Sequence, residues 1–381
     1  MRLNRTITQL AISACLLAAT SLAAAPPAGA CIYALDPTAH RAFQIAGSNS
    51  VSAACSAVVA SSATDAFEME GSETFFLQNH AQVGVVGGWQ LNGQTSLKDT
   101  ISNLTVLPFV ITAPSDPLSS VAAPTTGIIV SASHVNYDMN NKPANNTLSP
   151  GVYCGGLTIG NTGGVNFNLN PGTYIMAGGG LVINSQAKVT GTGVTVYNTS
   201  STGWGCSGSS SYTPINIDGQ ANVTLSAPTT GALAGILFFG NRTGCATLGS
   251  CQNTIQGGAT TALDGALYFK SDTILFSGAN STSGYMMLVA DIIHINGNST
   301  FGTSGNPLNG ISVAVTPGTA SLYAAQTQQF SASVANTGNS AVTWTVSPAS
   351  GAITSAGLYT APSAISAQST VTVTATRSLS E

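Results

Sequence analysis

Charge is what this sequence has least of. Charged residues make up 6% of the 381 residues, against about 25% in an ordinary soluble domain. The formal net charge is −4 and no basic patch occurs, which excludes a nucleic-acid-binding function. Hydrophobic residues still make up 43% of the chain, enough to build a core. The surface must therefore consist mainly of Ser, Thr, Asn, Gln and Gly, which suits an extended β architecture outside the cell.

Helical periodicity is also nearly absent beyond the N-terminus, where residues 1–30 are predicted to be a signal peptide. Arg2 and Arg5 form a positive start, an apolar stretch continues to Ala25, and residues 28–30 form a small-x-small cleavage site. We therefore expect a bacterial protein that is secreted or held at the cell surface. The alternative is an uncleaved membrane anchor, although the stretch is shorter than the ~20 residues that a span needs. Membrane contact is expected only in that case.

Cysteine spacing predicts disulfides rather than a metal site. One of the seven cysteines, Cys15, lies in the predicted signal peptide, and an even number in the exported remainder favours bridges. No Cys-x-x-Cys pair occurs, so neither a zinc knuckle nor a redox motif is indicated. A lipoprotein acylated at Cys31 is a weaker alternative, because Ala28 stands where Leu or Val is usual. The remaining six allow fifteen pairings, and closeness in sequence favours Cys245–Cys251 and Cys31–Cys55, which leaves Cys154–Cys206 by elimination.

Short alternating apolar runs recur along the chain, each followed by a Gly- or amide-rich step. The phrases "SPGVYCGGLTI" and "NPGTYIMAGGGLVI" are nearly the same text, with Pro150 and Pro171 twenty-one residues apart. A period near twenty, with three short strands in each repeat, is typical of a solenoid. We therefore predict an all-β chain with a right-handed parallel β-helix over residues 31–305. The alternative is a β-sandwich with Gly-rich turns.

The composition changes near Asn309. Residues 310–378 contain alternating strands with turn signals every eight to twelve residues, and Trp344 lies in the middle of one such strand. This pattern predicts a small immunoglobulin-like β-sandwich. The segment also resembles a bacterial Ig-like domain of group 2, and that resemblance implies a spacer or adhesion module without catalysis. The stretches that carry it are "AAQTQQFSASV" (324–334), "VTWTV" (342–346) and "GAITSAGLYTAP" (351–362).

The larger region resembles the extracellular repeat region of TadG-like proteins, which are associated with tight-adherence (Flp) pilus assembly. Members often begin with a membrane-anchored pilin-like helix, whereas a cleavable signal is predicted here. The chain ends at Glu381, directly after the Ig-like segment, as a piece of a longer protein would. The stretches that carry the resemblance are "CIYALDPTA" (31–39), "VGVVGG" (83–88), "LSPGVYCGGLTI" (148–159), "NPGTYIMAGGGL" (170–181), "VTGTGVTVYNT" (189–199), "LAGILFFGNR" (233–242), "GALYF" (265–269) and "LVADIIHINGNSTF" (288–301).

Many β-helices are polysaccharide lyases or hydrolases, which need clustered carboxylates. The best candidates are Asp264, Asp272 and Asp291, with Lys270 nearby. Asp272 and Asp291 are nineteen residues apart, which matches the local coil step and predicts that they stack on adjacent coils. The other interpretation, which we favour, is that each Asp merely caps a coil corner.

A second acidic stretch is "FEMEGSE". Glu68 and Glu70 share one strand face, with Glu73 after the turn and His80 following. This arrangement predicts either a cation site or, more simply, a solvated strand face. No Gly-x-Ser-x-Gly elbow or phosphate loop occurs. The histidines show no paired metal spacing; they are His40, His80, His134 and His294.

These observations predict an exported, non-enzymatic surface or structural protein in cell-surface attachment or pilus-associated assembly, with no cofactor or metal. Expected partners are other surface or pilus components, or extracellular glycans. Stacked Thr, Ser and Asn side chains on a flat β-helix face offer hydrogen bonds to glycans, neighbouring subunits or ice. The alternatives are a carbohydrate-binding adhesin and, less favoured, a β-helix polysaccharide lyase or hydrolase.

Overall fold

The protein is all-β wherever the computed structural model describes it. Among the described residues, no helix has the length and apolar character needed to cross a bilayer. Most of the predicted signal peptide and His134 lie outside these residues. The described ranges are 23–27, 29–48, 50–131, 137–138, 146–160, 166–209, 211–245, 251–257, 261–278, 286–301, 312–335 and 342–377.

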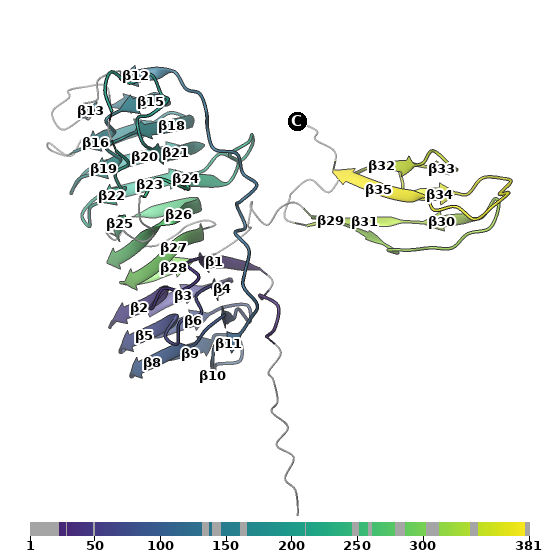
Figure 1. Ribbon diagram of the computed structural model, residues 1–381, viewed down its shortest axis with the longest axis horizontal. Coiled ribbons are helices and arrows are strands. Elements are labelled where there is room, and N and C mark those ends of the chain that lie inside the picture. The colour runs from purple at the N-terminus through teal and green to yellow at the C-terminus, as the bar shows by residue number, and fades with distance from the viewer. Residues whose placement is uncertain are drawn as a thin grey trace, which may run out of the picture.

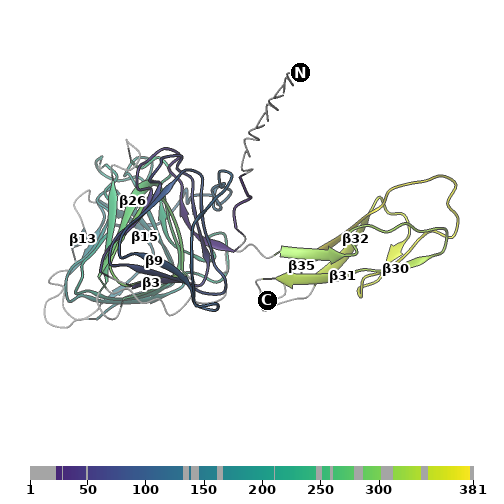
Figure 2. The ribbon, with the colours of Figure 1, turned by 90° about the horizontal axis from the view of Figure 1, so that it is seen from below.

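Residues 24–301, here called the coil domain, wind into stacked turns of three short strands each. One turn contains β15 (Gly151–Cys154), β16 (Leu157–Ile159) and β17 (Asn166–Leu169). The next turn begins with β18 (Gly172–Ala177), which pairs with β15 in parallel through Val152 and Ile175. The view along the stack shows a three-sided cross-section (Figure 2). This stacked parallel pairing fits the predicted β-helix and excludes the antiparallel sandwich for this region.

The first face of the coil domain is one continuous parallel sheet that runs the length of the stack (Figure 1). Its strands, in spatial order, are β12 (Ile129–Ser131), β15, β18, β21 (Val194–Thr199), β24 (Ile236–Gly240), the middle of β26 (Ala262–Gly278), the first part of β27 (Met286–Asn296), β1 (Ala30–Ala34), β4 (Ser56–Val59), β7 (Val83–Val85) and β11 (Phe109–Val110).

The second and third faces repeat the same vertical order. The second contains β13 (Tyr137–Asp138), β16, β19 (Leu181–Ile183), β22 (Asn216–Ile217), β25 (Gln252–Gly257), the later parts of β26 and β27, β2 (Phe43–Gly47), β5 (Phe67–Gly71) and β8 (Trp89–Gly93). The third contains β14 (Thr147–Leu148), β17, β20 (Lys188–Thr192), β23 (Asn222–Ser226) and the start of β26, then β28 (Ser299–Phe301), β3 (Ser50–Ala53), β6 (Thr74–Leu77), β9 (Ser96–Asp99) and the antiparallel β10 (Leu104–Val106).

The order of the coils in space is not their order in the chain. The last coil stacks on the first, through the pairs Ile32–Leu288 and Phe43–Ile293. An extended connection, residues 112–128 (the strap), carries the chain from β11 at one end of the stack to β12 at the other (Figure 1). The N-terminal and C-terminal blocks of coils therefore form one sheet system although the chain enters it in the middle.

The strap is pinned to the outside of the first face by Arg242. Its guanidinium donates hydrogen bonds to the carbonyl oxygens of Leu118 and Val121, at 2.7 and 2.9 Å, and to the Tyr268 hydroxyl at 2.7 Å. The same guanidinium lies over the rings of Phe239 and Tyr268, 5.1 Å from each centroid. Leu118 of the strap is buried and packs into the main core cluster. The first face is therefore covered on both sides, which explains why strands such as β15, β21 and β24 are buried at every position.

Glycine is required where neighbouring coils approach most closely. Gly179 has a φ of 78°, in the left-handed region, and a Cβ added there would lie 1.9 Å from the carbonyl oxygen of Gly155 on the adjacent coil. No larger residue fits that corner. The Gly-Gly bend of the repeated phrase is thus the contact between two successive coil corners.

Residues 312–377, here called the C-terminal unit, form a separate small antiparallel β structure. Phe330, Tyr359 and Ala361 make its core, with Trp344 packed against them. Its strands are β29 (Ser312–Thr316), β30 (Thr327–Gln329), β31 (Ser331–Ala335), β32 (Val342–Ser347), β33 (Ala352–Ile353), β34 (Leu358–Thr360) and β35 (Thr372–Arg377), paired as β29–β31, β32–β35 and β30–β34–β33.

We predict that Arg242→Ala loosens the strap without unwinding the coils. The substitution removes charge-assisted hydrogen bonds to two strap carbonyls, so the free energy of unfolding should fall by about 2–3 kcal/mol in urea denaturation. Limited proteolysis should then cut between residues 112 and 128 faster than in the wild type. Lys188→Ala, at an exposed position of β20, is the control and should change neither measurement. Equal protease resistance in the two variants would contradict the role of Arg242.

Candidate functional sites

Two of the three candidate aspartates meet at the corner between the first and second faces. Phe269 pairs with Ala290 and Thr273 with Ile292, so the three residues from Lys270 to Asp272 oppose the single residue Asp291. This bulge places Asp272 beside Asp291 on the neighbouring coil, as their spacing predicts. Asp264 lies elsewhere, on the third face, where it pairs with Ser226 of β23. The predicted cluster is therefore a pair and a separate residue.

Asp272 is fully buried and joins two other parts of the chain to this corner, Tyr212 between β21 and β22 and Asn253 on β25. Its carboxylate accepts hydrogen bonds from Ser271 Oγ at 2.9 Å, Asn253 Nδ2 at 2.9 Å and the Tyr212 hydroxyl. Burial raises the pKa of Asp272, and burial with the neighbouring carboxylate raises the pKa of Tyr212 well above its usual value. Asp272 is thus held by side chains from distant parts of the chain, which spacing alone does not reveal.

Asp291 is buried with less support. It is 3% exposed, and its Oδ2 atom has no hydrogen-bond partner among the described residues. Burial and the nearby Asp36 carboxylate raise its pKa to about 6, with a smaller contribution from Asp272, while Lys270 acts in the opposite direction. Asp36 follows β1, and its backbone N–H donates to the Asp291 carbonyl oxygen at 3.0 Å. Sequence reasoning missed Asp36 because the junction of the last coil with the first brings it there.

This buried carboxylate corner does not have the form of a glycosidase site. Such sites present two carboxylates to one bond, about 5–9.5 Å apart, with room for a sugar between them. Here Asp272 is 0% exposed and Asp291 is 3% exposed. A polymer cannot touch either group without local unfolding of the corner.

The six cysteines form three disulfides, which are Cys31–Cys55, Cys154–Cys206 and Cys245–Cys251, the pairs that closeness and elimination favour. Only one group of possible metal ligands gathers within 4.8 Å among the described residues, and it contains Cys245, Cys251 and Asp272. Both sulfurs of this group are used by their disulfide, so it offers no thiolate to a metal. Three bridges are consistent with an oxidising environment such as the cell exterior.

The two glutamates on β5 differ, because Glu68 belongs to a buried network whereas Glu70 faces the solvent, as the solvated-face interpretation predicts. Glu68 is 2% exposed, accepts Arg41 Nε at 2.9 Å, and also accepts hydrogen bonds from Gln44 and Asn92. Glu70 on the same strand is exposed. Each carboxylate oxygen of Glu68 already has a donor, which leaves no free ligand pair for a cation.

The described histidines pair locally with carboxylates or lie against the backbone. His40 Nδ1 is 2.5 Å from Asp65, and His80 Nδ1 is 2.9 Å from Asp99. The pKa of Asp99 is lowered to about 2 by hydrogen bonds from the Ser102 hydroxyl and the Ile101 N–H, together with His80. Burial lowers the pKa of His294. None of these pairs brings a second histidine into reach.

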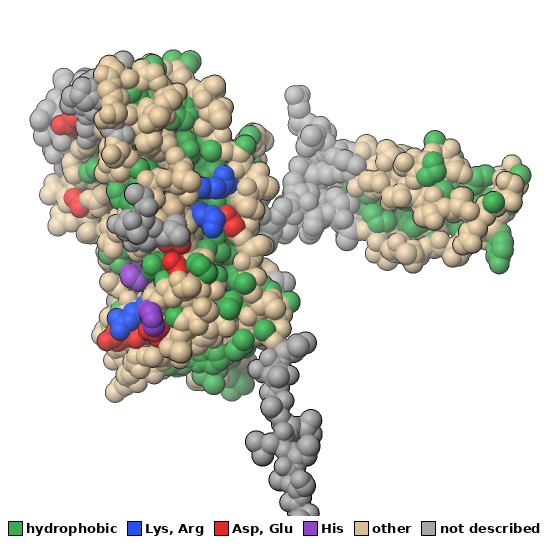
Figure 3. Space-filling model, in the orientation of Figure 1, with side chains coloured by type: hydrophobic (Ala, Val, Ile, Leu, Met, Phe, Trp, Pro, Cys, Tyr) green, Lys and Arg blue, Asp and Glu red, His purple; other side chains and the backbone are tan. Residues whose placement is uncertain are grey.

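The third face carries a ladder of uncharged polar side chains over β14, β17, β20 and β23, exposed on three of these strands and half-buried at Thr190 of β20. Thr147, Asn168, Thr190 and Thr224 are successive pair partners across these strands, and Thr190 Oγ1 donates to Asn168 Oδ1 at 3.4 Å. The alternate residues of these strands, such as Val189, point into the core. We call these four residues the polar ladder. Charged side chains gather only in small groups on the surface in view (Figure 3).

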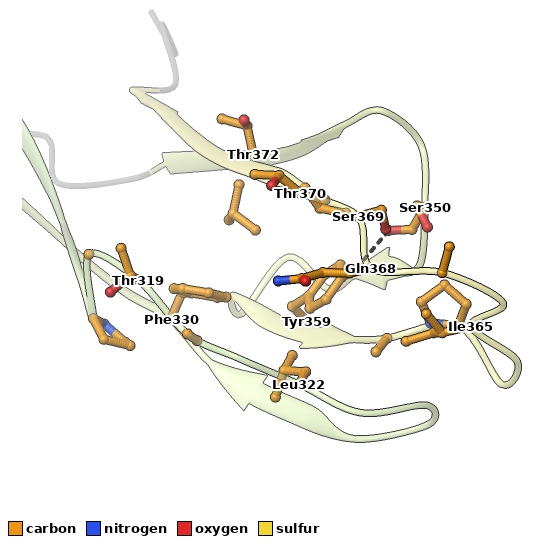
Figure 4. A pocket seen from close by; sticks show the side chains of 18 of the residues that line it. Thr319, Leu322, Phe330, Ser350, Tyr359, Ile365, Gln368, Ser369, Thr370 and Thr372 are labelled. Carbon is orange, nitrogen blue, oxygen red and sulfur yellow. Dashed lines mark hydrogen bonds between the residues drawn. The ribbon is translucent and has the colours of Figure 1, made fainter.

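A cavity of about 700 Å³ lies in the C-terminal unit, between its core and the 362–373 segment. Phe330, Tyr359 and Leu322 line it, and the Tyr359 hydroxyl donates to the Ser350 carbonyl oxygen at 2.7 Å (Figure 4). Its lining contains no Asp, Glu, His, Lys, Arg or Cys. The only ionisable or nucleophilic groups in this lining are hydroxyls, such as those of Tyr359 and Ser369, and none of them has a carboxylate, imidazole or amine in the lining to activate it.

No protein-family model matches this chain, and no curated protein or solved structure matches it either.

We predict that Asp291→Asn removes a pH-dependent instability of the junction. Because the folded protein binds a proton at Asp291 more tightly than the unfolded chain does, wild-type stability at this group falls as the pH rises from about 4 through about 6. Between pH 4 and pH 7.5 the variant should gain about 1–2 kcal/mol relative to the wild type, a value discounted for partial solvent screening. Thermal melts at both pH values measure this. A constant difference between the two proteins would contradict the buried, protonated state.

Proposed function

We propose that this chain is an exported, non-enzymatic structural protein that works in attachment at a bacterial cell surface or in pilus-associated assembly. The observation that carries the proposal is the contrast between Asp272 and Asp291, which are sealed inside the fold, and the polar ladder, which is mostly exposed. The two carboxylates that the sequence offers as a catalytic pair are buried, and the third face displays hydroxyl and amide groups to the solvent. A long stack of coils that contains three disulfides and buries its candidate catalytic pair suits a rigid spacer better than an enzyme.

The finer assignments belong to the same proposal. The coil domain is proposed to be a right-handed parallel β-helix, and the C-terminal unit an immunoglobulin-like spacer of the bacterial group 2 type. The resemblance to TadG-like repeat proteins supports pilus-associated surface components as partners. The three disulfides support export through the predicted signal peptide.

The enzyme alternative is tested directly by turnover. We expect purified protein to release no sugar fragments from pectin, alginate or xylan-type polymers, because neither buried aspartate reaches the solvent. Reducing-end and unsaturated-product assays measure this, with a commercial lyase and hydrolase as positive controls. Asp272→Asn and Asp291→Asn are the matched variants. Reproducible product formation that either variant abolishes would move the function to the enzyme class.

A carbohydrate-binding adhesin is the second candidate, and the polar ladder is the observation that favours it. Flat rows of hydroxyl and amide groups match the hydroxyl groups of a glycan chain. If this candidate is right, Thr190→Lys with Thr224→Lys should weaken binding to immobilised polysaccharides by about tenfold or more, equal to about 1.4 kcal/mol. Gln256→Lys, at an exposed position of the second face, should leave binding unchanged. An equal loss of polysaccharide binding in the ladder variant and in Gln256→Lys would show that the added charge, and not the loss of the polar ladder, weakens binding.

A further inference from the structure

The coil domain has two ends, and both leave apolar side chains in solvent. At the β12 end, Ile128 is 83% exposed, Ile129 42% and Val130 39%. At the β11 end, Leu104 is 64% exposed and Leu107 66%. Large apolar residues are otherwise well covered along the described coils, so exposure of this kind is concentrated where the stack stops. Such patches commonly mark interaction surfaces.

The two ends also present strand edges of the same sheet. Among the described residues, β12 pairs only with β15, and it contains neither a charged residue nor a proline to block its outer edge. The outer edge of β11 is occupied by Ala24, whose N–H donates to the Val110 carbonyl oxygen at 3.1 Å and whose carbonyl oxygen accepts Thr112 N–H at 2.7 Å. We call residues 23–27 the edge-covering segment. A single bridge holds it there.

The chain itself shows that two blocks of coils can stack end to end. At the internal junction, β27 pairs with β1 over Ile32–Leu288 to Ala34–Ala290, although these strands lie at opposite ends of the coil domain's sequence. The open ends continue the same geometry. Ile129 of β12 and Phe109 of β11 are the first and last members of one column of paired residues that crosses every strand of the first face.

We propose that copies of this chain stack head to tail, with β12 of one copy pairing in parallel with β11 of the next, and that the edge-covering segment competes for the β11 edge. All strands of the first face run in one direction, so the added copy continues the ladder without reversal. Because the two contacting surfaces differ, the association is heterologous and extends into a filament. Cleavage at the small-x-small site of residues 28–30 removes the edge-covering segment and uncovers β11. This inference does not depend on the proposed attachment function.

The test compares two secreted forms of the chain, one beginning at Ala23 and one beginning at Cys31, where cleavage after the small-x-small site would leave it. Sedimentation velocity over a concentration series should show that the shorter form grows in mass while the longer form stays smaller at each concentration. Electron microscopy should show rods whose lengths are multiples of one coil domain. Ala24→Pro in the longer form removes the N–H that bonds Val110, so it should promote association without truncation and serves if the shorter form fails to fold.

A third variant identifies the surfaces. Ile129→Lys in the shorter form places a charge at the β12 edge and should abolish growth of the rods. When a small amount of this variant is mixed with the unsubstituted form, the rods should become shorter. The variant's β11 end still binds another copy, whereas its β12 end does not. Gln256→Lys, at an exposed position of the second face away from both ends, is the matched control and should leave growth intact. A shorter form and an Ala24→Pro variant that both fold and both stay monomeric would overturn the proposal, as would growth that Ile129→Lys leaves unchanged.

Discussion

The pairing of the last coil with the first is the contact on which the rest of the coil domain depends. It joins two blocks of coils that are far apart in sequence, through β27 with β1 and β2 and through β28 with β3. A parallel contact of this range requires a long connection, and the strap provides it. The strap in turn must lie on something, which is why the first face is apolar outside as well as inside. Arg242 completes the arrangement by donating hydrogen bonds from one guanidinium to two strap carbonyls, those of Leu118 and Val121.

The junction also explains where the buried charge lies. Coils that stack in register bring the same corner of each turn into a column, and at the junction that column contains Asp272, Asp291 and Asp36. Asp272 has three donors, whereas Asp291 has two acidic neighbours and one oxygen that receives no donor from the described part of the chain. A buried carboxylate in that position is stable chiefly when protonated. The stability of the junction is thereby coupled to pH.

Sequence predicted the local features of this fold and missed the long-range ones. Glycine spacing predicted the coils, and the nineteen-residue interval placed Asp272 beside Asp291. The junction was not predictable in this way, because no sequence pattern around Ile32 indicates that it pairs with Leu288. The approach of Tyr212 to Asp272 and of Asp36 to Asp291 depends on loops and on the junction, so it was missed too. One usable signal was overlooked: the run from Ile236 to Phe239 does not alternate, which is typical of a strand covered on both faces.

The distribution of polar groups limits how this protein can recognise anything. The strap covers the first face. In the N-terminal part of the second face, Glu68 and Arg41 form an ion pair with each other and so offer no free charge to a partner. What remains outside is mostly hydroxyl and amide groups held at the regular spacing of paired strands, about 4.8 Å apart. Long-range attraction between charges falls off within about 10 Å at ordinary salt, and this surface has little charge to begin with. Recognition by such a face must therefore come from matched hydrogen-bond geometry and apolar contact, and its strength should depend little on ionic strength.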